Sequence, residues 1–424
     1  VTVSTMNLSS AYFSPSAPLN HAAVNPLFSF MYSATHQSHF SDQFRFYPSQ
    51  QEAESIYADL LRNGGSAAQD TLPAPRRPEL SISEPDIYIV ILESFSSYLM
   101  PSLGGDSVAM NLDSIARGSI LFTDFYASSF RTDRSLPAIL SGYPAQPTTS
   151  VMKYTDKTER MPSLPRSLAS LGYGLEYYYG GDANFTNMKA FLVSAGFSTI
   201  ISDKDFPVSE RLSKWGVHDD RLFSLLTSRI EARPASASPM LTVIQTSSSH
   251  EPFEVPFSSS FSDPRLNAFA YTDHCVGQWI NSLRADPERW RRALVIMLPD
   301  HWGVWPDNLP PGPARHRIPL IMTGGAIASP MPQRVNLTAS QTDLAATVLA
   351  MLGHESDMPF SHDIFDPSLA RSAFFSEPDL AALVAPTDTV VLNLATGEPS
   401  PAASPLAPAV KAYLQVLYTD LDSL

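Results

Sequence analysis

Four short, unbroken apolar runs constrain the fold of this chain more than any other feature. Helical patterns separate these runs, which cover residues 86–92, 241–246, 293–298 and 318–322. Strands that are buried on both faces of a parallel sheet read as continuous apolar runs, whereas half-exposed strands alternate. Amphipathic stretches at 161–172 and 270–284 supply crossover helices. We therefore expect an α/β fold with a doubly wound, mostly parallel sheet.

The length and the changes of pattern predict three parts. The 424 residues exceed what one hydrophobic core usually holds. Residues 1–82 read as an arm, a helix at 51–63 that ends at a glycine pair, and a linker, all packed on the body. Residues 83–365 form the α/β domain. Residues 366–424 form a small α+β appendage of two or three strands and a final helix from about Leu406.

Charge and cysteine content exclude some classes of protein. The net charge of −14 and the pI near 5.1 argue against a nucleic-acid binder, which needs clustered Lys and Arg. No segment reaches the roughly 18 uninterrupted apolar residues of a membrane helix. The single cysteine, Cys275, permits neither an intramolecular disulfide nor a cysteine-rich zinc site.

Polar residues follow three of the apolar runs directly. Glu93 follows the first run, His250 follows the second within a serine-rich loop, and Asp300 and His301 follow the third. Ligands of parallel sheets bind at the carboxyl ends of the strands, where these side chains would meet. Carboxylates and an imidazole form an O/N ligand set for a divalent cation. The alternative is that such acids only cap the next helix, or that a loop histidine is simply exposed.

A nucleophile is offered by Thr132, which precedes a helical run. Helix N-termini favour anions, and a hydroxyl beside a metal would be activated there. Alternatively, Thr132 or Asp133 is only a helix cap. Arg134 could hold a phosphate oxygen, although an Arg in a first helical turn is more often exposed or paired with a neighbour. His316 follows the Asp300–His301 loop and could line the site, but its place before Arg317 favours a surface residue.

These strings resemble the lipoteichoic acid synthase-like branch of the sulfatase/alkaline phosphatase superfamily. The resemblance is carried in order by Glu93 in VILES, Thr132 in FRTDRS, His250 in SSSHEPF, and Asp300 and His301 in LPDHWG. It extends through residues 141–154, 177–197 and 317–327, and residues 4–26 look like the arm that precedes the catalytic domain in that family. Four motifs in order are far more specific than one.

The resemblance implies a transferase that moves a phosphoglycerol or phosphoethanolamine head group from a phospholipid donor to a hydroxyl-bearing acceptor of the cell envelope. It implies that one Mn²⁺ or Zn²⁺ is bound by Glu93, Thr132, Asp300 and His301, and that Thr132 is also the nucleophile. His250 would face the phosphate or the leaving group. The resemblance further implies an extracytoplasmic location, with a membrane anchor upstream of Val1.

The head-group segment departs from the pattern of the synthases. Asp182 and Asn187 match that pattern and are the expected substrate-binding residues, together with Arg134. Gly180 stands where the synthases have a His, and Thr186 and Met188 stand where they have Trp and Arg. A head group other than plain phosphoglycerol therefore fits the sequence.

Three alternatives stay open beside the transferase. A phosphodiesterase with water as acceptor uses the same residues. A sulfatase needs a Cys or Ser for conversion to formylglycine where this chain has Thr132, and Cys275 lies elsewhere. A non-catalytic lipid- or glycan-binding homologue fits less well, because the four expected ligand residues are all present. The donor, the acceptor, the metal and the oligomeric state are not fixed by these residues.

Overall fold

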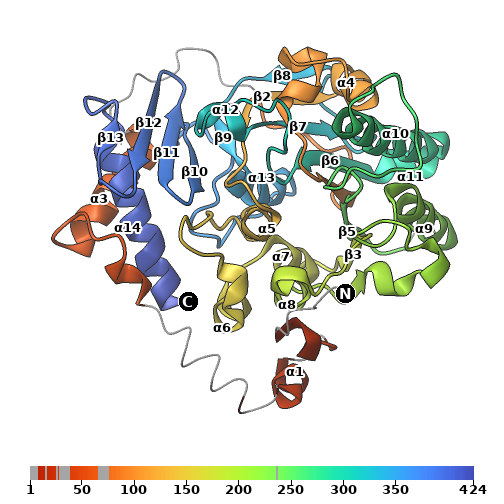
Figure 1. The fold of residues 1–424 in the computed structure, drawn as a ribbon, viewed down its shortest axis with the longest axis horizontal. Coiled ribbons are helices and arrows are strands. Elements are labelled where there is room, and N and C mark those ends of the chain that lie inside the picture. The colour runs from red at the N-terminus through yellow and green to blue at the C-terminus, as the bar shows by residue number, and fades with distance from the viewer. Residues whose placement is uncertain (1–7, 15–16, 25–26, 28–38, 65–75, 235–236) are drawn as a thin grey trace.

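The computed structural model describes residues 8–14, 17–24, 27, 39–64, 76–234 and 237–424. Within this part of the chain, the centre of the molecule is a sheet of nine strands (Figure 1). Its strands are β1 (Asp86–Leu92), β2 (Ile120–Tyr126), β3 (Gly174–Tyr179), β4 (Thr199–Ile201), β5 (Met240–Gln245), β6 (Ala293–Pro299), β7 (Arg317–Thr323), β8 (Gln333–Val335) and β9 (Ala339–Ser340). Every residue of β1 and β6 is buried, as their unbroken apolar sequences predict.

The sheet is mixed but mostly parallel, with the order β4-β3-β5-β1-β6-β7-β2-β8, and β9 pairs with β2. The strands from β4 to β6 are parallel to their neighbours, which confirms the expected fold class. β7 is different, because it runs antiparallel to both β6 and β2. The expectation that the run at 318–322 joins a parallel sheet was therefore wrong for this strand. The connection from β6 contains only the four-residue helix α12 (Pro313–His316), so no crossover carries the chain back before β7 begins.

Helices cover both faces of the sheet, as a doubly wound fold requires. Alternate residues of β1 enter two separate cores, with Ile89 in one and Val90 in the other. Core residues of one face come from α5 (Thr132–Ser141), α7 (Leu164–Ser170), α8 (Met188–Ser194) and α13 (Leu344–Met351). Core residues of the other face come from α4 (Met110–Arg117), α9 (Asp219–Ala232) and α10 (Pro264–Ala285). The short helices α6 (Thr155–Arg160) and α11 (Pro287–Arg292) lie at the periphery (Figure 1).

A second, antiparallel sheet stands beside the first. It is formed by β10 (Ala373–Glu377), β11 (Leu380–Ala385), β12 (Asp388–Asn393) and β13 (Pro399–Ser400), in that order. The helix α14 (Ala407–Ser423) follows it. This arrangement confirms the small C-terminal α+β unit and the helix that were expected near Leu406.

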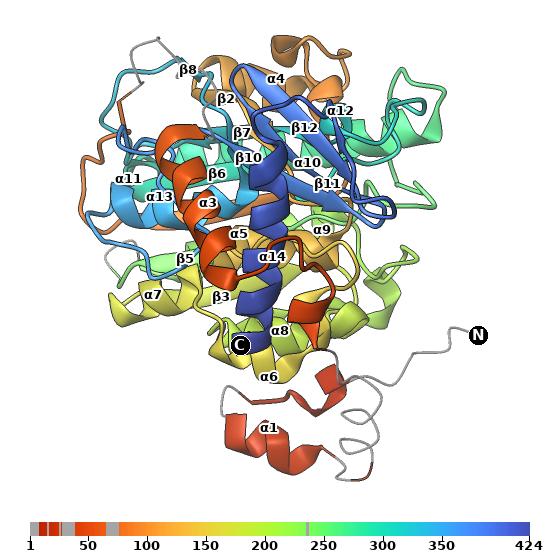
Figure 2. The same ribbon diagram turned by 90° about the vertical axis from the view of Figure 1, so that its left-hand side faces the viewer.

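The last helix contacts the N-terminal part of the described chain. α3 (Gln50–Asn63) packs along α14, and Figure 2 shows the two helices side by side. Gln415 accepts hydrogen bonds from the backbone N–H groups of Phe46 and Tyr47, and Asp422 accepts from those of Phe40 and Ser41. The structure describes the short helix α1 (Ala17–Ala23) of the expected arm, whereas other parts of the arm and most of the expected linker at 66–79 lie outside the described residues.

Candidate active site

Three strands of the main sheet deliver side chains to the same edge. Glu93 follows β1, Asp300 and His301 follow β6, and Thr132 follows β2 after a five-residue loop. β1 and β6 are parallel, and β2 points the same way because the antiparallel β7 separates it from β6. All three carboxyl ends therefore meet where parallel sheets bind ligands.

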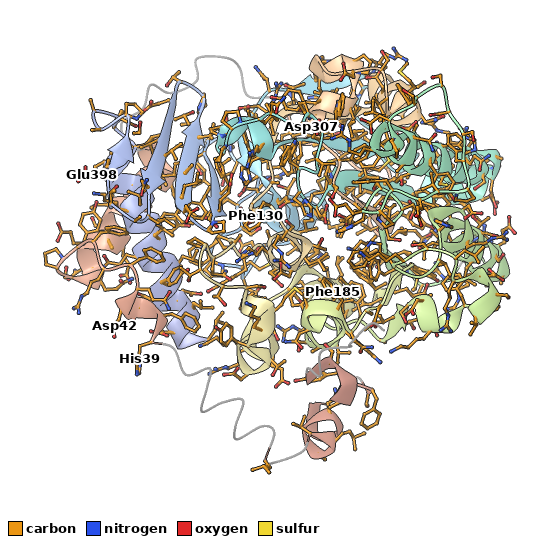
Figure 3. The ribbon with its side chains drawn as sticks, in the orientation of Figure 1. His39, Asp42, Phe130, Phe185, Asp307 and Glu398 are labelled. Carbon is orange, nitrogen blue, oxygen red and sulfur yellow. The ribbon has the colours of Figure 1, made fainter. Side chains whose placement is uncertain are left out.

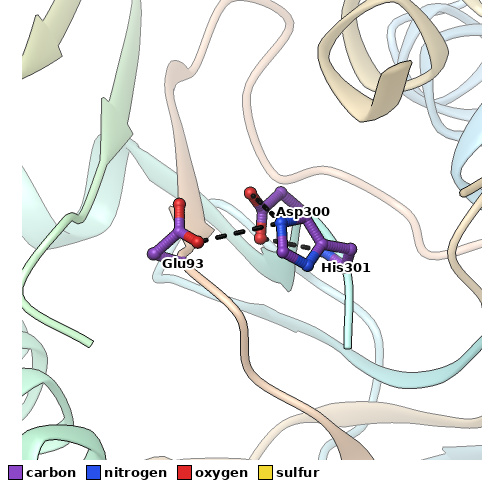
Figure 4. Close-up of side chains that lie close together, drawn as sticks. All are labelled: Glu93, Asp300 and His301. Atoms are coloured by element: carbon purple, nitrogen blue, oxygen red, sulfur yellow. Dashed lines mark hydrogen bonds and ion pairs between the residues drawn. The ribbon is translucent and has the colours of Figure 1, made fainter. Parts of the chain in front are cut away.

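Glu93, Asp300 and His301 form a compact, buried group (Figure 4). The Nε2 atom of His301 lies 3.7 Å from Oε1 of Glu93 and 3.4 Å from Oδ2 of Asp300. Burial, and then the neighbouring carboxylate of Asp300, raise the pKa of Glu93 well above its ordinary value. Two buried carboxylates side by side either share a proton or have a positive charge between them. Two oxygen donors and one nitrogen donor fit a hard or borderline divalent cation, so these residues could hold a metal ion.

Backbone groups fix the orientation of this group. Oδ1 of Asp300 accepts hydrogen bonds from the N–H of Ser94 at 2.9 Å and from the N–H of His301 at 2.8 Å. Nδ1 of His301 lies 2.8 Å from the carbonyl oxygen of Trp302, so Nδ1 carries the ring proton and Nε2 is left to face the carboxylates. Ser94 adopts a left-handed conformation with φ 61°, and Gly303 lies so close that a Cβ there would be 2.5 Å from the Ser94 carbonyl oxygen. The site thus holds a locally strained backbone in place.

Thr132 is the first residue of α5, and Arg131 takes the N-cap position before it. The hydroxyl of Thr132 does not cap the helix but donates to Oδ2 of Asp300 at 2.7 Å. The helix N-terminus and the carboxylate–imidazole group therefore flank one hydroxyl. An anion at this position would meet the free N–H groups of the helix start.

His250 lies beside this group on the loop after β5. Its Nδ1 is 3.2 Å from the carbonyl oxygen of Glu251, so Nδ1 carries the proton and Nε2 can accept one. Burial lowers the pKa of His250, which favours the neutral ring. The ring packs on Trp215 at 4.4 Å between centroids, and the indole of Trp215 donates to the same Glu251 carbonyl.

Two cavities open onto this edge. The threonine-side cavity has a volume of about 320 Å³ and is lined by Glu93, Phe130, Arg131, Thr132, Asp133, Tyr179, Phe185, Thr186, Met188, Trp215, His250 and His301. The glutamate-side cavity has a volume of about 350 Å³ and is lined by Ser94, Ser129, Phe130, Ser249, His250, Glu251, Phe253, His301, Trp302, Gly303, Val304, Arg315, His316 and Glu377. The two cavities share Phe130, His250 and His301. Figure 3 shows Phe130 near the middle of the molecule and Phe185 near α8.

The structure separates the residues of the expected head-group segment. Thr186 and Met188 line the threonine-side cavity, whereas Asp182 and Asn187 are not among its lining residues. Asp182 accepts hydrogen bonds from Asn184 and lies 3.9 Å from the ammonium group of Lys204. Within the described residues, the buried Oδ1 of Asn187 has no hydrogen-bond partner. Of the three positions that depart from the synthases, Thr186 and Met188 therefore face the cavity, whereas Gly180 does not line it.

Gly180 sits where a larger residue does not fit. A Cβ atom at this position would lie 2.8 Å from the carbonyl oxygen of Val217. The N–H of Val217 donates to the carbonyl of Gly180, so the two segments lie edge to edge. The segment that contains Val217 thus takes up space beside the position where the synthases have a His.

The expected substrate contact of Arg134 is not brought to the threonine-side cavity. Its guanidinium group donates to the carbonyl oxygens of Gln146 and Thr149, and it lies over the ring of Phe130. These bonds hold the loop after α5, which is a structural role. The arginine that lines the cavity beside Thr132 is Arg131, which the sequence reasoning missed although it stands in the same FRTDRS string.

The expectation that His316 lies on the surface was wrong. His316 is 1% exposed, stacks on Phe375 at 3.9 Å between ring centroids, and lies 3.1 Å from Oε1 of Glu377. Both His316 and Glu377 line the glutamate-side cavity. Sequence reasoning also missed Glu377, because nothing in the C-terminal strands signals that they reach the sheet edge.

Comparisons with known proteins agree with this geometry. A family model described as Sulfatase matches residues 85–354. The chain is 20% identical over 363 residues to the lipoteichoic acid synthase-like YvgJ of Bacillus subtilis. The aligned region covers 76% of this chain and 57% of YvgJ. It is 25% identical over 199 residues to phosphoglycerol transferase I of Xanthomonas campestris, which covers 44% of this chain and 28% of that protein. This chain therefore spans little more than half of the first relative and a smaller part of the second.

The fold is also found in a solved structure. An alkaline phosphatase superfamily protein from Vibrio parahaemolyticus superposes with a TM-score of 0.77 at 23% identity, over 90% of this chain and 98% of that one. Among the helices that the structure describes, none combines the length and the hydropathy that a membrane span needs.

Proposed function

The chain belongs to the sulfatase family, and from that premise we propose that it transfers a phosphoglycerol or phosphoethanolamine head group from a phospholipid to a hydroxyl acceptor. The observation that carries this proposal is the hydrogen bond from the Thr132 hydroxyl to Asp300, at the start of a helix and beside Glu93 and His301. The names of two relatives, a lipoteichoic acid synthase-like protein and a phosphoglycerol transferase, support phosphoglycerol as one transferred group.

The donor set fits a divalent cation, which we propose to be Mn²⁺ or Zn²⁺. Glu93, Asp300 and His301 would hold it, with Thr132 beside it. Such a cation, when bound, neutralises charge on a phosphate and lowers the pKa of a neighbouring hydroxyl. The raised pKa of Glu93 supports this role, because burial and a second carboxylate disfavour its charge until a cation compensates.

In the first half of the proposed reaction, Thr132 Oγ1 attacks the phosphorus of the donor lipid. The bond from phosphorus to the diacylglycerol oxygen breaks as the bond to Oγ1 forms, and a phosphothreonine that carries the head group remains. The hydroxyl proton of Thr132 passes to Nε2 of the neutral His250 ring, which its lowered pKa keeps free to accept one. His250 then delivers a proton to the diacylglycerol oxygen and is neutral again.

In the second half, the oxygen of the acceptor hydroxyl attacks the same phosphorus and the bond to Thr132 Oγ1 breaks. His250 takes the proton of the acceptor and passes it to Thr132 Oγ1, so the protein returns to its first state. Arg131, on the wall of the threonine-side cavity, can hold a phosphate oxygen or the head group. Asp182 and Asn187 would act at the rim of this site.

We also propose where the reaction takes place and which part of the chain performs it. By resemblance to the lipoteichoic acid synthases, the protein acts outside the cytoplasm, at a membrane that supplies the donor lipid. Residues 83–365 would be the catalytic domain, and residues 366–424 a subdomain attached to it.

The test is direct detection of the phosphothreonine. The protein, loaded with Mn²⁺ or Zn²⁺, is mixed with detergent-dispersed phosphatidylglycerol or phosphatidylethanolamine, quenched and digested. We expect a Thr132 peptide that is heavier by one phosphoglycerol or one phosphoethanolamine group, with diacylglycerol released. Thr227→Ala is a matched control, because the Thr227 hydroxyl donates to the Phe223 carbonyl within α9.

Two results would contradict the proposal. Turnover of a sulfate ester without diacylglycerol from any lipid would favour the sulfatase class. Release of diacylglycerol that persists in Thr132→Ala would leave a phosphodiesterase reaction without a covalent intermediate.

A further inference from the structure

The glutamate-side cavity adjoins the reaction centre without reaching the nucleophile. It shares Phe130, His250 and His301 with the threonine-side cavity, but Thr132 lines only the latter. In an in-line displacement at phosphorus, the entering and the leaving oxygen lie on opposite sides. The place for the diacylglycerol oxygen, and later for the acceptor oxygen, is therefore on the side away from Thr132.

Glu377 is the residue that the second sheet contributes to this cavity. It is the last residue of β10, and its neighbour Ser376 is fixed to the loop before Thr132. The N–H of Ser376 donates to the carbonyl of Ser128 at 3.0 Å, and its carbonyl accepts from the hydroxyl of Ser129 at 2.7 Å. The carboxylate of Glu377 is thereby held in a fixed position relative to the nucleophile.

His316 orients this carboxylate. Its Nδ1 lies 3.1 Å from the carbonyl oxygen of Ala127, and its Nε2 lies 3.1 Å from Oε1 of Glu377. Both partners only accept hydrogen bonds when Glu377 is ionised, so each ring nitrogen then carries a proton. Burial alone would raise the pKa of Glu377, but the hydrogen bond and the charge of His316 lower it below its ordinary value. The second carboxylate oxygen, Oε2, lies 3.8 Å from Arg315.

The walls of the cavity indicate the chemistry of its occupant. Phe130, Phe253 and Trp302 supply aromatic surface, and Arg315 lies over the ring of Trp302 at 5.0 Å. The volume of about 350 Å³ is in the range of small-molecule pockets. The positive charge of Arg315 is met by the carboxylate of Glu377 at 3.8 Å. A neutral molecule with apolar faces and hydroxyl edges matches these walls better than an anion does.

We propose that the glutamate-side cavity binds the acceptor, a neutral polyhydroxyl compound, and that Glu377 accepts a hydrogen bond from one of its hydroxyl groups. This bond turns another hydroxyl of the same molecule toward the phosphorus on Thr132. The inference rests on the proposed function, because it names the class of acceptor for that transfer. Glu377 binds the acceptor, and His316 positions Glu377.

The test compares transfer with hydrolysis in the same reaction. The metal-loaded full chain receives detergent-dispersed phosphatidylglycerol with methyl β-glucoside, a neutral polyol, or with glycerol 1-phosphate, an anionic one. Rapid quenching measures the adduct on Thr132, and product analysis gives the ratio of transfer to hydrolysis. Glu377→Gln should lower the ratio for methyl β-glucoside at least tenfold, while the adduct on Thr132 still forms. Asp379→Asn is the matched control, since Asp379 is exposed on the turn after β10, and it should leave the ratio unchanged.

Each outcome has one meaning. An unchanged ratio in Glu377→Gln with a normal adduct would overturn the inference and leave the proposed function standing. If Glu377→Gln does not fold, the wild-type protein decides, because a preference for glycerol 1-phosphate over methyl β-glucoside would equally overturn the inference. If the wild-type protein forms no adduct on Thr132 and releases no diacylglycerol, the proposed function itself fails and the inference fails with it.

Discussion

The two cavities share a border but are built differently. The threonine-side cavity takes its walls from loops of the main sheet, whereas the glutamate-side cavity adds Glu377 from the separate C-terminal sheet. Both meet at His250 and His301, where the chemistry is proposed. One reaction centre therefore borders two binding walls that come from different parts of the chain. Residues of either wall can be substituted without changing the residues of the centre.

The two walls also differ in how firmly they are held. Glu377 is held by His316 and by the bonds of its neighbour Ser376. In contrast, Thr186 in the threonine-side wall and its neighbour Asn187, which does not line the cavity, adopt consecutive left-handed conformations, with φ 52° and 61°. Such conformations are costly for residues other than glycine. A substitution in the threonine-side wall can therefore most easily increase the free energy of unfolding.

The largest difference between the two cavities should appear when the nucleophile, which lines only the threonine-side cavity, is removed. Thr132→Ala should lower diacylglycerol release at least about a thousandfold, because it removes the atom that attacks phosphorus. Thr132→Ser, which keeps a hydroxyl, should retain measurable activity. Steady-state release of diacylglycerol checks both variants. Equal activity of Thr132→Ala and wild type would place the chemistry outside the threonine-side cavity.

The second largest effect is expected at the proposed metal ligands, which lie next to the border that the two cavities share. Asp300→Ala combined with His301→Ala removes two of three proposed donors and should weaken Mn²⁺ or Zn²⁺ binding by more than about a hundredfold. Elemental analysis after dialysis measures the metal per chain. The control is Asp357→Ala with His354→Ala, an exposed acid and imidazole on the surface. Equal loss of metal from both double variants would refute the assignment.

A third prediction separates the two arginines on either side of Thr132. Arg131→Ala should raise the KM for the donor lipid about tenfold, as loss of one charge-assisted contact predicts, with the free energy of unfolding unchanged. Arg134→Ala should leave KM unchanged and lower the free energy of unfolding by about 2 kcal/mol, because two loop carbonyls lose their donor. Donor titrations and urea denaturation distinguish the two. The opposite pattern would restore Arg134 as the substrate contact.

The smallest expected effect sharpens the contrast between the walls. Thr186→Gly should increase the free energy of unfolding by about 1 kcal/mol, since a β-branched residue at positive φ is relieved. Urea denaturation is the measurement, and Thr227→Gly, within the regular helix α9, should destabilise by a similar amount. A loss of stability in Thr186→Gly would mean that contacts of the Thr186 side chain outweigh the strain.

The sheet could be predicted only as far as its strands are apolar throughout. The runs that became β1, β5 and β6 are buried along nearly their whole length and stood out for that reason. β2 was missed because Thr123 and Asp124 interrupt its sequence. In the structure these two residues lie at a shift in register, where the carbonyl of Thr123 accepts from Arg317. The direction of β7 could not be predicted, because a buried run has the same composition in either orientation.

Some residues of the candidate site could likewise be predicted from the sequence, whereas others could not. Glu93, Asp300 and His301 could be proposed together because each follows directly after a strand of one parallel sheet. Which arginine reaches the cavity depends on the exact start of α5, which sequence patterns place only within a few residues. The contact between His316 and Glu377 joins residues 61 positions apart, one at the end of α12 directly before β7 and one at the end of β10 in the second sheet, so it depends on how the two sheets dock.

The contact between α3 and α14 affects the order in which the chain can fold. α3 begins at Gln50, whereas α14 is made only after more than three hundred further residues have been added. During synthesis, the apolar face of α3 stays without its partner helix until α14 emerges, and pairings over such sequence distances form late. The residues around Phe40 and Tyr47 gain their bonds to Asp422 and Gln415 at the same moment. Protection of residues 39–64 from proteases should therefore appear only after α14 has emerged from the ribosome.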